Sequence, residues 1–367
     1  MQSTTRVVES ASQSKDLPWG RAFRYYRFLL GPCVAYVVIC FGMLAMYRPE
    51  LLSDTFLDIF NFMTGSLIMF FAALAIYVVG YLVKHRPARP LTDLVKALRS
   101  EHLKDDNIPF IIIPWLTMAV VITFFVKMKI LIPTINPFYL DLAAHDLDKW
   151  LHFGSHPWEW LAPITNIPDI TYILHRNYYV WFPAIYITFY WQVCTVRNPK
   201  LRLQFILSFV GVWVIIGTGL ATALSSVGPI YFDRIAGGNS TSYAGAMAYL
   251  EALNAKEPLL TIEVREQLWN SYLGIVENRY VRGISAMPSV HVAMAFLLLL
   301  LGWSKHWAIG TAYTVFGVMI AIASVSLLWH YAIDGYISIL AVGLIWWGAG
   351  KLAERSVASD EEFSQQG

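Results

Sequence analysis

The sequence is poor in charged residues and in cysteine. Only 14% of its 367 residues are Asp, Glu, Lys or Arg, whereas soluble proteins carry about 25%. The formal net charge of +2 gives no sign of the strongly basic surface that binds nucleic acid. The cysteines lie in apolar runs without the spacing of a metal site, which predicts buried free thiols and no disulfide framework: Cys33, Cys40 and Cys194.

Long uncharged runs account for the low charge. A helix needs about 20 apolar residues to cross a bilayer, and six runs approach or exceed that length: 28–47, 59–83, 108–126, 177–196, 203–224 and 284–303. The next 44 residues, 307–350, are too long for one span, and their only polar break lies around 329–334. We therefore expect a hairpin of two spans there. The fold class predicted is an all-α polytopic membrane protein with about eight transmembrane helices.

Composition divides the chain into four parts. Residues 1–20 are predicted to be a mobile polar tail, and residues 354–367 a polar C-terminal tail. Residues 21–107 contain two N-terminal spans followed by an amphipathic helix with a basic polar face, on which Leu91, Leu94, Val95 and Leu98 recur at helical spacing. A solvated linker helix explains that last pattern equally well. Residues 108–353 form a six-helix membrane domain.

The distribution of basic residues predicts the orientation in the membrane. With eight spans, both termini lie on one side, and 17 of the 27 Lys and Arg residues fall there. Cytoplasmic loops carry the excess of positive charge, so we expect cytoplasmic termini. The end of the fifth span, the start of the sixth and the 329–334 hairpin then face the periplasm or lumen.

The first of two polar stretches on that face is Ser285-Ala286-Met287-Pro288-Ser289-Val290-His291. Proline is favoured at the first position of a helix, so the sixth span is predicted to begin at Pro288. Free N–H groups at a helix start bind anions, and the Ser289 hydroxyl adds a donor. His291, one turn into the helix, could donate a proton to a leaving oxygen.

The second stretch contains His330 and Asp334, four residues apart, which predicts that both lie on one face of the eighth span. A carboxylate beside one imidazole nitrogen fixes the tautomer and makes the other nitrogen more nucleophilic. Attack on phosphorus would give a phosphohistidine, which water or an alcohol then resolves. Ionisable residues inside membranes are costly and mark functional sites, so we interpret the two stretches as one phosphate-handling site with His291 and His330 in opposite roles.

A third group of polar residues falls on one stripe of a predicted helix: Asp141, His145, Asp148 and His152. Histidine and carboxylates are metal ligands, so a metal site is conceivable. We favour the wet face of an interfacial helix instead. Phosphohistidine chemistry requires no metal or other cofactor.

Four motifs carry a resemblance to a known family: Ile135-Asn136-Pro137-Phe138, Gly228-Pro229-Ile230-Tyr231, Ala286-Met287-Pro288-Ser289-Val290-His291 and Trp329-His330-Tyr331-Ala332-Ile333-Asp334. The last two resemble the Pro-Ser-x-His and His-x-x-x-Asp motifs of the type 2 phosphatidic acid phosphatase superfamily. Together the four are similar to its inositol phosphorylceramide synthase-like branch, over about residues 108–350. The resemblance implies that His330 is the nucleophile, Asp334 its partner and His291 the general acid. It also implies a six-helix core and transfer of a phospho-alcohol head group between membrane lipids.

The chain departs from the general family pattern at its basic residues. No Lys stands seven positions before the Arg of an Arg-Pro pair, and Ala323-Ser324 replaces the expected Ser-Arg. The residues that bind the phosphate are therefore open. The candidates are Ser289, Gly228, Tyr231 and two arginines close to the motifs, Arg234 and Arg282, although either arginine could equally be a loop charge at the lipid surface.

Three other functions compete with head-group transfer. A phosphatase acting on phosphatidate or a polyprenyl phosphate would use the same residues with water as the acceptor. A proton-coupled transporter could use His291, His330 and Asp334 as a proton relay, but transporters often show internal repeats, and none is evident. A membrane scaffold would leave the cost of the buried polar groups unexplained. We expect membrane lipids to be the partners, and no nucleic acid.

Overall fold

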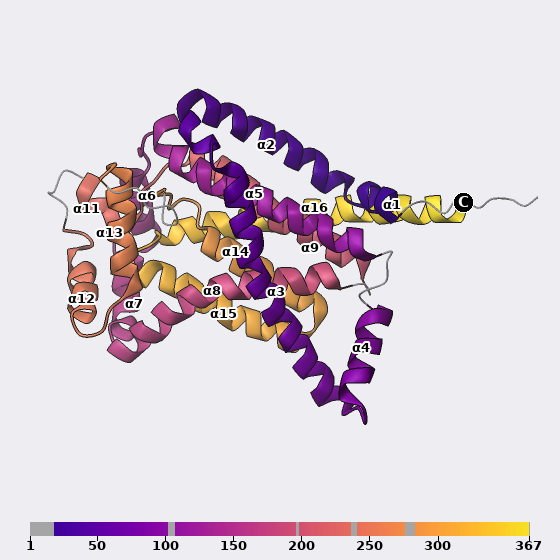
Figure 1. Ribbon diagram of the computed structural model, residues 1–367. Helices are drawn as coiled ribbons and strands as arrows, with labels where there is room; N and C mark the ends of the chain where they lie inside the picture. The colour runs from indigo at the N-terminus through magenta and orange to yellow at the C-terminus, as the bar shows by residue number, and fades with distance from the viewer. Residues whose placement is uncertain (1–17, 102–106, 196–197, 236–240, 276–282, 367) are drawn as a thin grey trace, which may run out of the picture.

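The structure is a computed structural model that describes residues 18–101, 107–195, 198–235, 241–275 and 283–366. The described residues form helices and connecting loops and contain no strand (Figure 1). The predicted all-α membrane fold is therefore confirmed. Most of the N-terminal tail lies outside the described residues.

Eight long helical segments coincide with the eight predicted spans. They are α2 (Arg27–Tyr47), α3 (Thr55–His85), α5 (Ile108–Ile135), α8 (Pro168–Cys194), the segment Pro199–Ala223, α14 (Val290–Lys305), α15 (Trp307–Ser326) and α16 (Ala332–Gln366). Six of them are long and apolar enough to cross a membrane. The other two are α14, which has 16 residues, and α8, whose 27 residues include His175, Arg176 and Asn177.

The fifth segment changes its helical geometry midway. It begins as α9 (Pro199–Gly211), continues as a π-helix (Val212–Leu220) and ends as α10 (Ala221–Ala223). A π-helix is rare and frequently marks a functional site. Here it turns Trp213 and Gly217 toward one cavity.

Two predicted positions at helix starts are wrong by one or two residues. The helix α14 begins at Val290 rather than Pro288, because Ser289 is the N-cap and its Oγ accepts a hydrogen bond from the Val292 N–H at 3.3 Å. His330 does not lie on the eighth span, because α16 begins at Ala332. His330 belongs instead to the turn 327–331 that joins α15 to α16.

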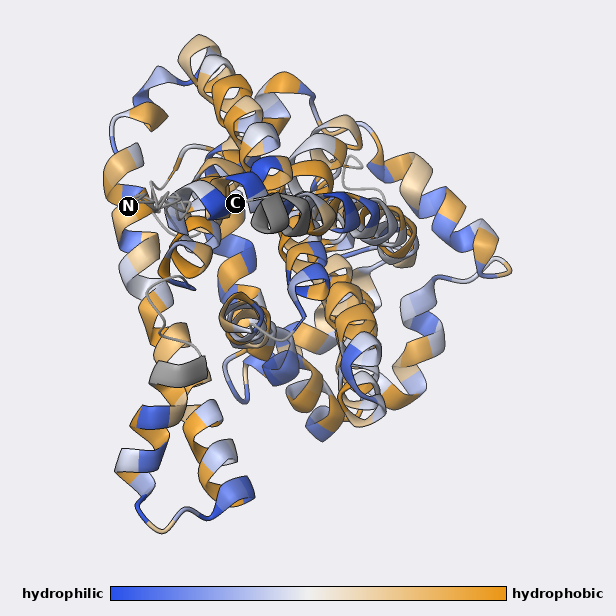
Figure 2. Cartoon of the chain, turned by 90° about the vertical axis from the view of Figure 1, so that its right-hand side faces the viewer, coloured by the Kyte–Doolittle hydropathy of each residue, from blue (hydrophilic) through white to orange (hydrophobic). Residues whose placement is uncertain are grey.

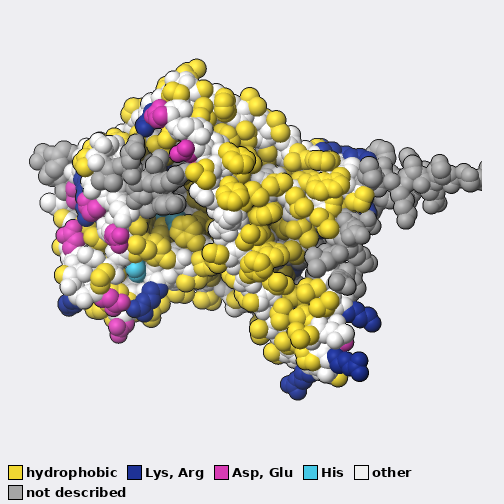
Figure 3. All heavy atoms as spheres, in the orientation of Figure 1, with side chains coloured by type: hydrophobic (Ala, Val, Ile, Leu, Met, Phe, Trp, Pro, Cys, Tyr) yellow, Lys and Arg dark blue, Asp and Glu magenta, His cyan; other side chains and the backbone are white. Residues whose placement is uncertain are grey.

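The two ends of the bundle carry different structures. The short helices α6 (Asp141–Leu151), α7 (Pro157–Thr165), α11 (Phe232–Ile235), α12 (Ala244–Asn254) and α13 (Leu260–Tyr272) gather at one end (Figure 1). The helix α1 (Pro18–Tyr25) and the C-terminal end of α16 lie at the other end. Hydrophobic side chains cover the middle of the visible face. Acidic and basic side chains collect at the end that carries α11–α13, and further basic side chains lie at the opposite end (Figure 3). This is the distribution expected of a protein that crosses a bilayer.

The N-terminal helices are peripheral. Only 6% of the most apolar part of α3 is buried. Its first half packs on α8, as at Phe62 and Tyr186, whereas its C-terminal end projects from the bundle with α4 (Pro90–Glu101) (Figure 2). The start of α3 is nevertheless anchored, since Lys127 Nζ on α5 lies 2.7 Å from Asp58 Oδ2 and 2.6 Å from the Leu51 carbonyl oxygen. This partly buried ion pair ties the start of α3 to α5.

Outside the membrane spans, His156 precedes α7 and its side chain is buried. Its backbone N–H donates to Glu159 Oε2 at 3.1 Å, and its ring lies 4.5 Å from His145 and 5.2 Å from Tyr243 between centroids. Burial, with the nearby His145, lowers the pKa of His156 to about 4. The folded protein therefore holds this imidazole neutral.

We expect His156 to make the protein less stable in mild acid. Between pH 6.5 and 4 the unfolded chain binds a proton at His156 that the folded chain does not. The free energy of unfolding therefore decreases as the pH is lowered, by up to about 3 kcal/mol. Thermal unfolding in detergent at pH 7 and pH 4.5 measures this change. His156→Gln should weaken the pH dependence, while His85→Gln, at an exposed position on α3, should leave it intact. If the unfolding temperature changes equally between pH 7 and pH 4.5 in all three proteins, His156 is not the cause of the pH dependence.

Candidate functional site

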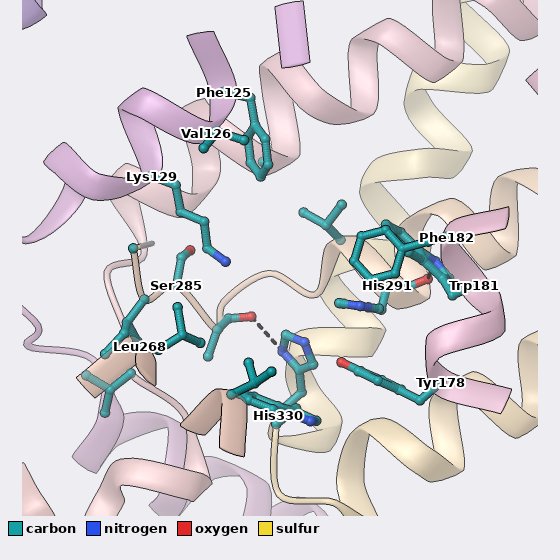
Figure 4. A pocket seen from close by; sticks show the side chains of 18 of the residues that line it. Phe125, Val126, Lys129, Tyr178, Trp181, Phe182, Leu268, Ser285, His291 and His330 are labelled. Atoms are coloured by element: carbon teal, nitrogen blue, oxygen red, sulfur yellow. Dashed lines mark hydrogen bonds between the residues drawn. The ribbon is translucent and has the colours of Figure 1, made fainter. Parts of the chain in front are cut away.

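A cavity of about 410 Å³ lies between α5, α8, the π-helix, α13 and the loops before α14 and α16. Most of its lining is apolar or aromatic. The side chains in it that can act on a phosphate are Lys129, Ser285, His291 and His330, with Tyr178 beside the two histidines (Figure 4). An apolar pocket with a few convergent polar groups is the usual form of a ligand site.

The two predicted histidines share this cavity. They are 39 residues apart in the sequence, and the α14–α15 pair brings their rings to 6.1 Å between centroids. One phosphate group between them could therefore contact both. The geometry is compatible with a shared phosphate site.

His330 is oriented by a backbone carbonyl. Its Nδ1 lies 2.8 Å from the Ala286 oxygen and 3.3 Å from Asp334 Oδ2. Because a carbonyl oxygen only accepts, Nδ1 must carry the hydrogen, which leaves a lone pair on Nε2. Burial lowers the pKa of His330 to about 3, although the Ala286 hydrogen bond acts in the opposite direction. The imidazole is thus held neutral, with the lone pair of Nε2 free.

Asp334 is completely buried behind His330. Its Oδ2 accepts the Tyr331 N–H at 3.1 Å in addition to facing His330 Nδ1. Its Oδ1 has no hydrogen-bond partner among the described residues. The predicted His330–Asp334 proximity is present, but the Ala286 carbonyl makes the shorter contact.

His291 is held by aromatic rings. Its imidazole stacks on Tyr178 at 4.3 Å between centroids and 16° between planes, and Trp181 lies 4.3 Å away on a tilted plane. The Trp181 indole N–H also donates to the His291 carbonyl oxygen at 3.0 Å. These contacts fix the ring plane while leaving its nitrogens directed toward the cavity.

Lys129 is the residue that sequence reasoning missed. It is the only Lys or Arg among the described residues lining the cavity, and its side chain points from α5 toward Ser285 and the histidines (Figure 4). A usable signal was present, because Asn136-Pro137 follows Lys129 at the spacing at which the family pattern has Arg-Pro. Asn136 replaces the arginine of that pair, so the usual family pattern does not include Lys129.

The residues predicted to bind the phosphate do not gather at one place in the cavity. Tyr231 lines the cavity, but its hydroxyl donates to the Arg265 carbonyl oxygen at 2.9 Å. Arg234 lies outside the lining and pairs with Glu266 Oε1 at 2.6 Å. Ser289 is buried and caps α14. Arg282 lies outside the described residues.

Gly228 has a structural reason for being glycine. Its φ is +85°, and a Cβ there would lie 2.8 Å from both the Ala286 Cβ and the Trp329 carbonyl oxygen. The loop 225–231 therefore passes directly between the two segments that carry the histidines. Gly283 allows a similar approach, since a Cβ there would lie 2.7 Å from the Lys129 carbonyl oxygen.

The polar stripe on α6 is not a solvent-exposed face at its two aspartates. Asp141 and Asp148 are only 1% and 2% exposed. Their carboxylates accept hydrogen bonds from backbone N–H groups of the loop 225–231 and of the first turn of α16. The wet-face prediction is wrong for these two residues. The described residues contain no group of three or more His, Cys, Asp or Glu that could hold a metal ion.

Comparison with known proteins gives one match. The model of a family described as the PAP2 superfamily matches residues 142–348. No curated protein and no solved structure matches the chain. The matched stretch contains His291, His330 and Asp334 and begins after Lys129.

Replacing Gly228 should destabilise the site. Gly228→Ala imposes a left-handed backbone on alanine and a clash with two neighbouring segments, so we expect a loss of about 1–3 kcal/mol in the free energy of unfolding. Thermal unfolding in detergent measures it. Gly343→Ala, at a helical position with nothing within 4 Å, is the matched control and should not lower stability. A Gly228→Ala protein as stable as this control would refute the steric argument.

Proposed function

Because the chain belongs to the PAP2 superfamily, we propose that it is a membrane-embedded lipid phosphotransferase or phosphatase acting through a phosphohistidine at His330. One observation carries the proposal. The Nδ1 hydrogen of His330 is fixed by the Ala286 carbonyl, so its Nε2 lone pair is available in a cavity that also contains His291 and Lys129.

The reaction has two steps with balanced bonds and protons. His330 Nε2 attacks phosphorus, a P–N bond forms, and the P–O bond to the leaving group breaks while His291 gives that oxygen a proton. An alcohol or water then attacks phosphorus. His291 takes the proton of the attacking oxygen, and the P–N bond breaks to release His330.

Charged neighbours support these steps. Phosphorylation makes the His330 ring cationic, and the Asp334 carboxylate, 3.3 Å from Nδ1, would stabilise that charge. The Lys129 ammonium would neutralise the phosphate oxygens, the role left open by the missing Arg-Pro motif.

The finer proposal is transfer of a phospho-alcohol head group, of the inositol-phosphate type, between two lipids. The motif resemblance favours it, and so does the lining of the cavity. Apolar side chains come from the membrane helices, as at Phe125 and Phe182, and also from α13, as at Val264 and Leu268. Hydrocarbon could therefore contact the cavity on both sides. Hydrolysis of a phosphatidate or polyprenyl phosphate is the second candidate, because the same residues could activate water.

We propose that the site faces the periplasm or lumen and that both termini are cytoplasmic. The distribution of Lys and Arg supports this orientation. The cavity lies at the end of the bundle that carries α13, and α1 lies at the opposite end (Figure 1). Cysteine labelling from either side of sealed vesicles would test it.

The reaction itself is tested with purified protein, labelled phosphatidylinositol or phosphatidate, and a lipid alcohol acceptor. We expect a phosphorylated intermediate and a labelled acceptor, and His330→Ala should lower turnover by at least about 10³-fold. His306→Gln, at an exposed position between α14 and α15, is the control. With water as the acceptor, phosphatidate gives free phosphate and phosphatidylinositol gives free inositol phosphate, so either as the only labelled product would favour hydrolysis over transfer. Full activity of His330→Ala would refute the phosphohistidine.

Lys129 should contribute strongly to the same reaction. Lys129→Met removes the only cationic side chain among the described residues of the cavity lining, so we expect kcat/KM to fall by about 10²- to 10³-fold. Lys129→Arg should retain part of the activity because it keeps the charge. Lys149→Met, an exposed lysine on α6, controls for loss of charge elsewhere. A Lys129→Met enzyme with unchanged kcat/KM would exclude Lys129 from phosphate binding.

A further inference from the structure

We propose that Asp141 and Asp148 on α6 are positioning residues, which hold the backbone around His330 in the geometry that phosphoryl transfer requires. This inference rests on the proposed function. Neither residue lines the cavity, so neither is a catalytic residue. Each carboxylate holds a different segment of the site.

Asp141 holds the loop 225–231. Its Oδ1 accepts the Ser226 hydroxyl at 2.8 Å and the Gly228 N–H at 2.9 Å, and its Oδ2 accepts the Val227 N–H at 3.0 Å. The Tyr331 hydroxyl donates to Oδ1 at 3.1 Å. One carboxylate thus joins this loop to the residue that follows His330.

Asp148 holds the start of α16. Its Oδ1 accepts the Ile333 N–H at 3.1 Å and its Oδ2 accepts the Ala332 N–H at 3.2 Å. These are N–H groups of the first turn, which have no partner within their own helix. A carboxylate from another helix therefore caps α16 two residues after His330, where the helix dipole favours negative charge.

A continuous path of hydrogen bonds leads from α6 to the proposed nucleophile. Ser226, held by Asp141, accepts the Ala286 N–H on its carbonyl oxygen at 2.9 Å. The Ala286 carbonyl in turn accepts the Nδ1 hydrogen of His330 at 2.8 Å. Displacing Ser226 would therefore displace the group that fixes the His330 tautomer.

The hydrogen-bond donors to the two carboxylates indicate that their role is to position the backbone. Their hydrogen-bond donors are backbone N–H groups and hydroxyls rather than Lys or Arg side chains. The one cationic candidate, His152 Nδ1, lies 3.9 Å from Asp148 Oδ1, beyond hydrogen-bond distance. Burying a carboxylate is costly unless it is hydrogen-bonded. The two carboxylates are seven residues apart, or two turns of one rigid helix, a spacing suited to holding two irregular segments in register.

The test compares Asp141→Asn, Asp148→Asn and wild type, with Asp146→Asn as the matched control. Asp146 is an exposed carboxylate on the same helix. An asparagine keeps the shape but loses one acceptor oxygen, so at least one donor is left unpaired. We expect kcat per folded enzyme to fall about 10- to 100-fold while KM stays within about twofold, because the cavity is intact and only the alignment of His330 is lost.

Hydrogen exchange supplies a readout that does not need activity. Asp148→Asn should speed amide exchange at 331–333, and Asp141→Asn at 226–228, while the control exchanges like wild type. Unchanged exchange, or a kcat within about twofold of the control, would overturn the inference. So would a loss of turnover accounted for entirely by the unfolded fraction. A wild type inactive on every lipid phosphate would instead overturn the proposed function itself.

Discussion

The hydrogen bond from His330 Nδ1 to the Ala286 carbonyl is the contact on which the site depends. It joins the loop before α14 to the turn before α16, and it selects the tautomer that leaves Nε2 free. Gly228, with φ of +85°, lies between the two segments, where a Cβ would clash with both. The hydrogen bonds of Asp141, Ser226 and Asp148 hold the segments that make this contact.

A protein in a bilayer must satisfy its buried polar groups internally, and this chain does so selectively. Lys127 is paired with Asp58, Asp141 accepts hydrogen bonds from N–H and O–H donors, and Asp148 accepts two from backbone N–H groups. Not every buried polar atom is satisfied. The indole nitrogens of Trp213 and Trp329, which line the cavity, have no hydrogen-bond partner among the described residues, and neither does the Gln192 side chain away from it.

Sequence patterns predicted the helices well and their ends less well. Apolar run length predicted all eight long segments. The 44-residue run required a hairpin, predicted around 329–334 and found at 327–331. Proline preference placed the start of α14 at Pro288, but the Ser289 side chain caps the helix one residue later. Periodicity identified the α6 stripe, but it could not show that Asp141 and Asp148 face inward, because their partners come from loops distant in sequence.

The sequence by itself determined the all-α membrane fold, the hairpin and the placing of His291, His330 and Asp334 near one another, because apolar run length and spacing are local properties of the chain. Only the tertiary structure decided which groups surround the histidines. Lys129 on α5 lines the cavity, whereas Arg234 lies outside it and pairs with Glu266. The Ala286 carbonyl accepts the hydrogen bond from His330 Nδ1. Such contacts join segments far apart in sequence, and their directions are fixed by packing, which no local pattern records.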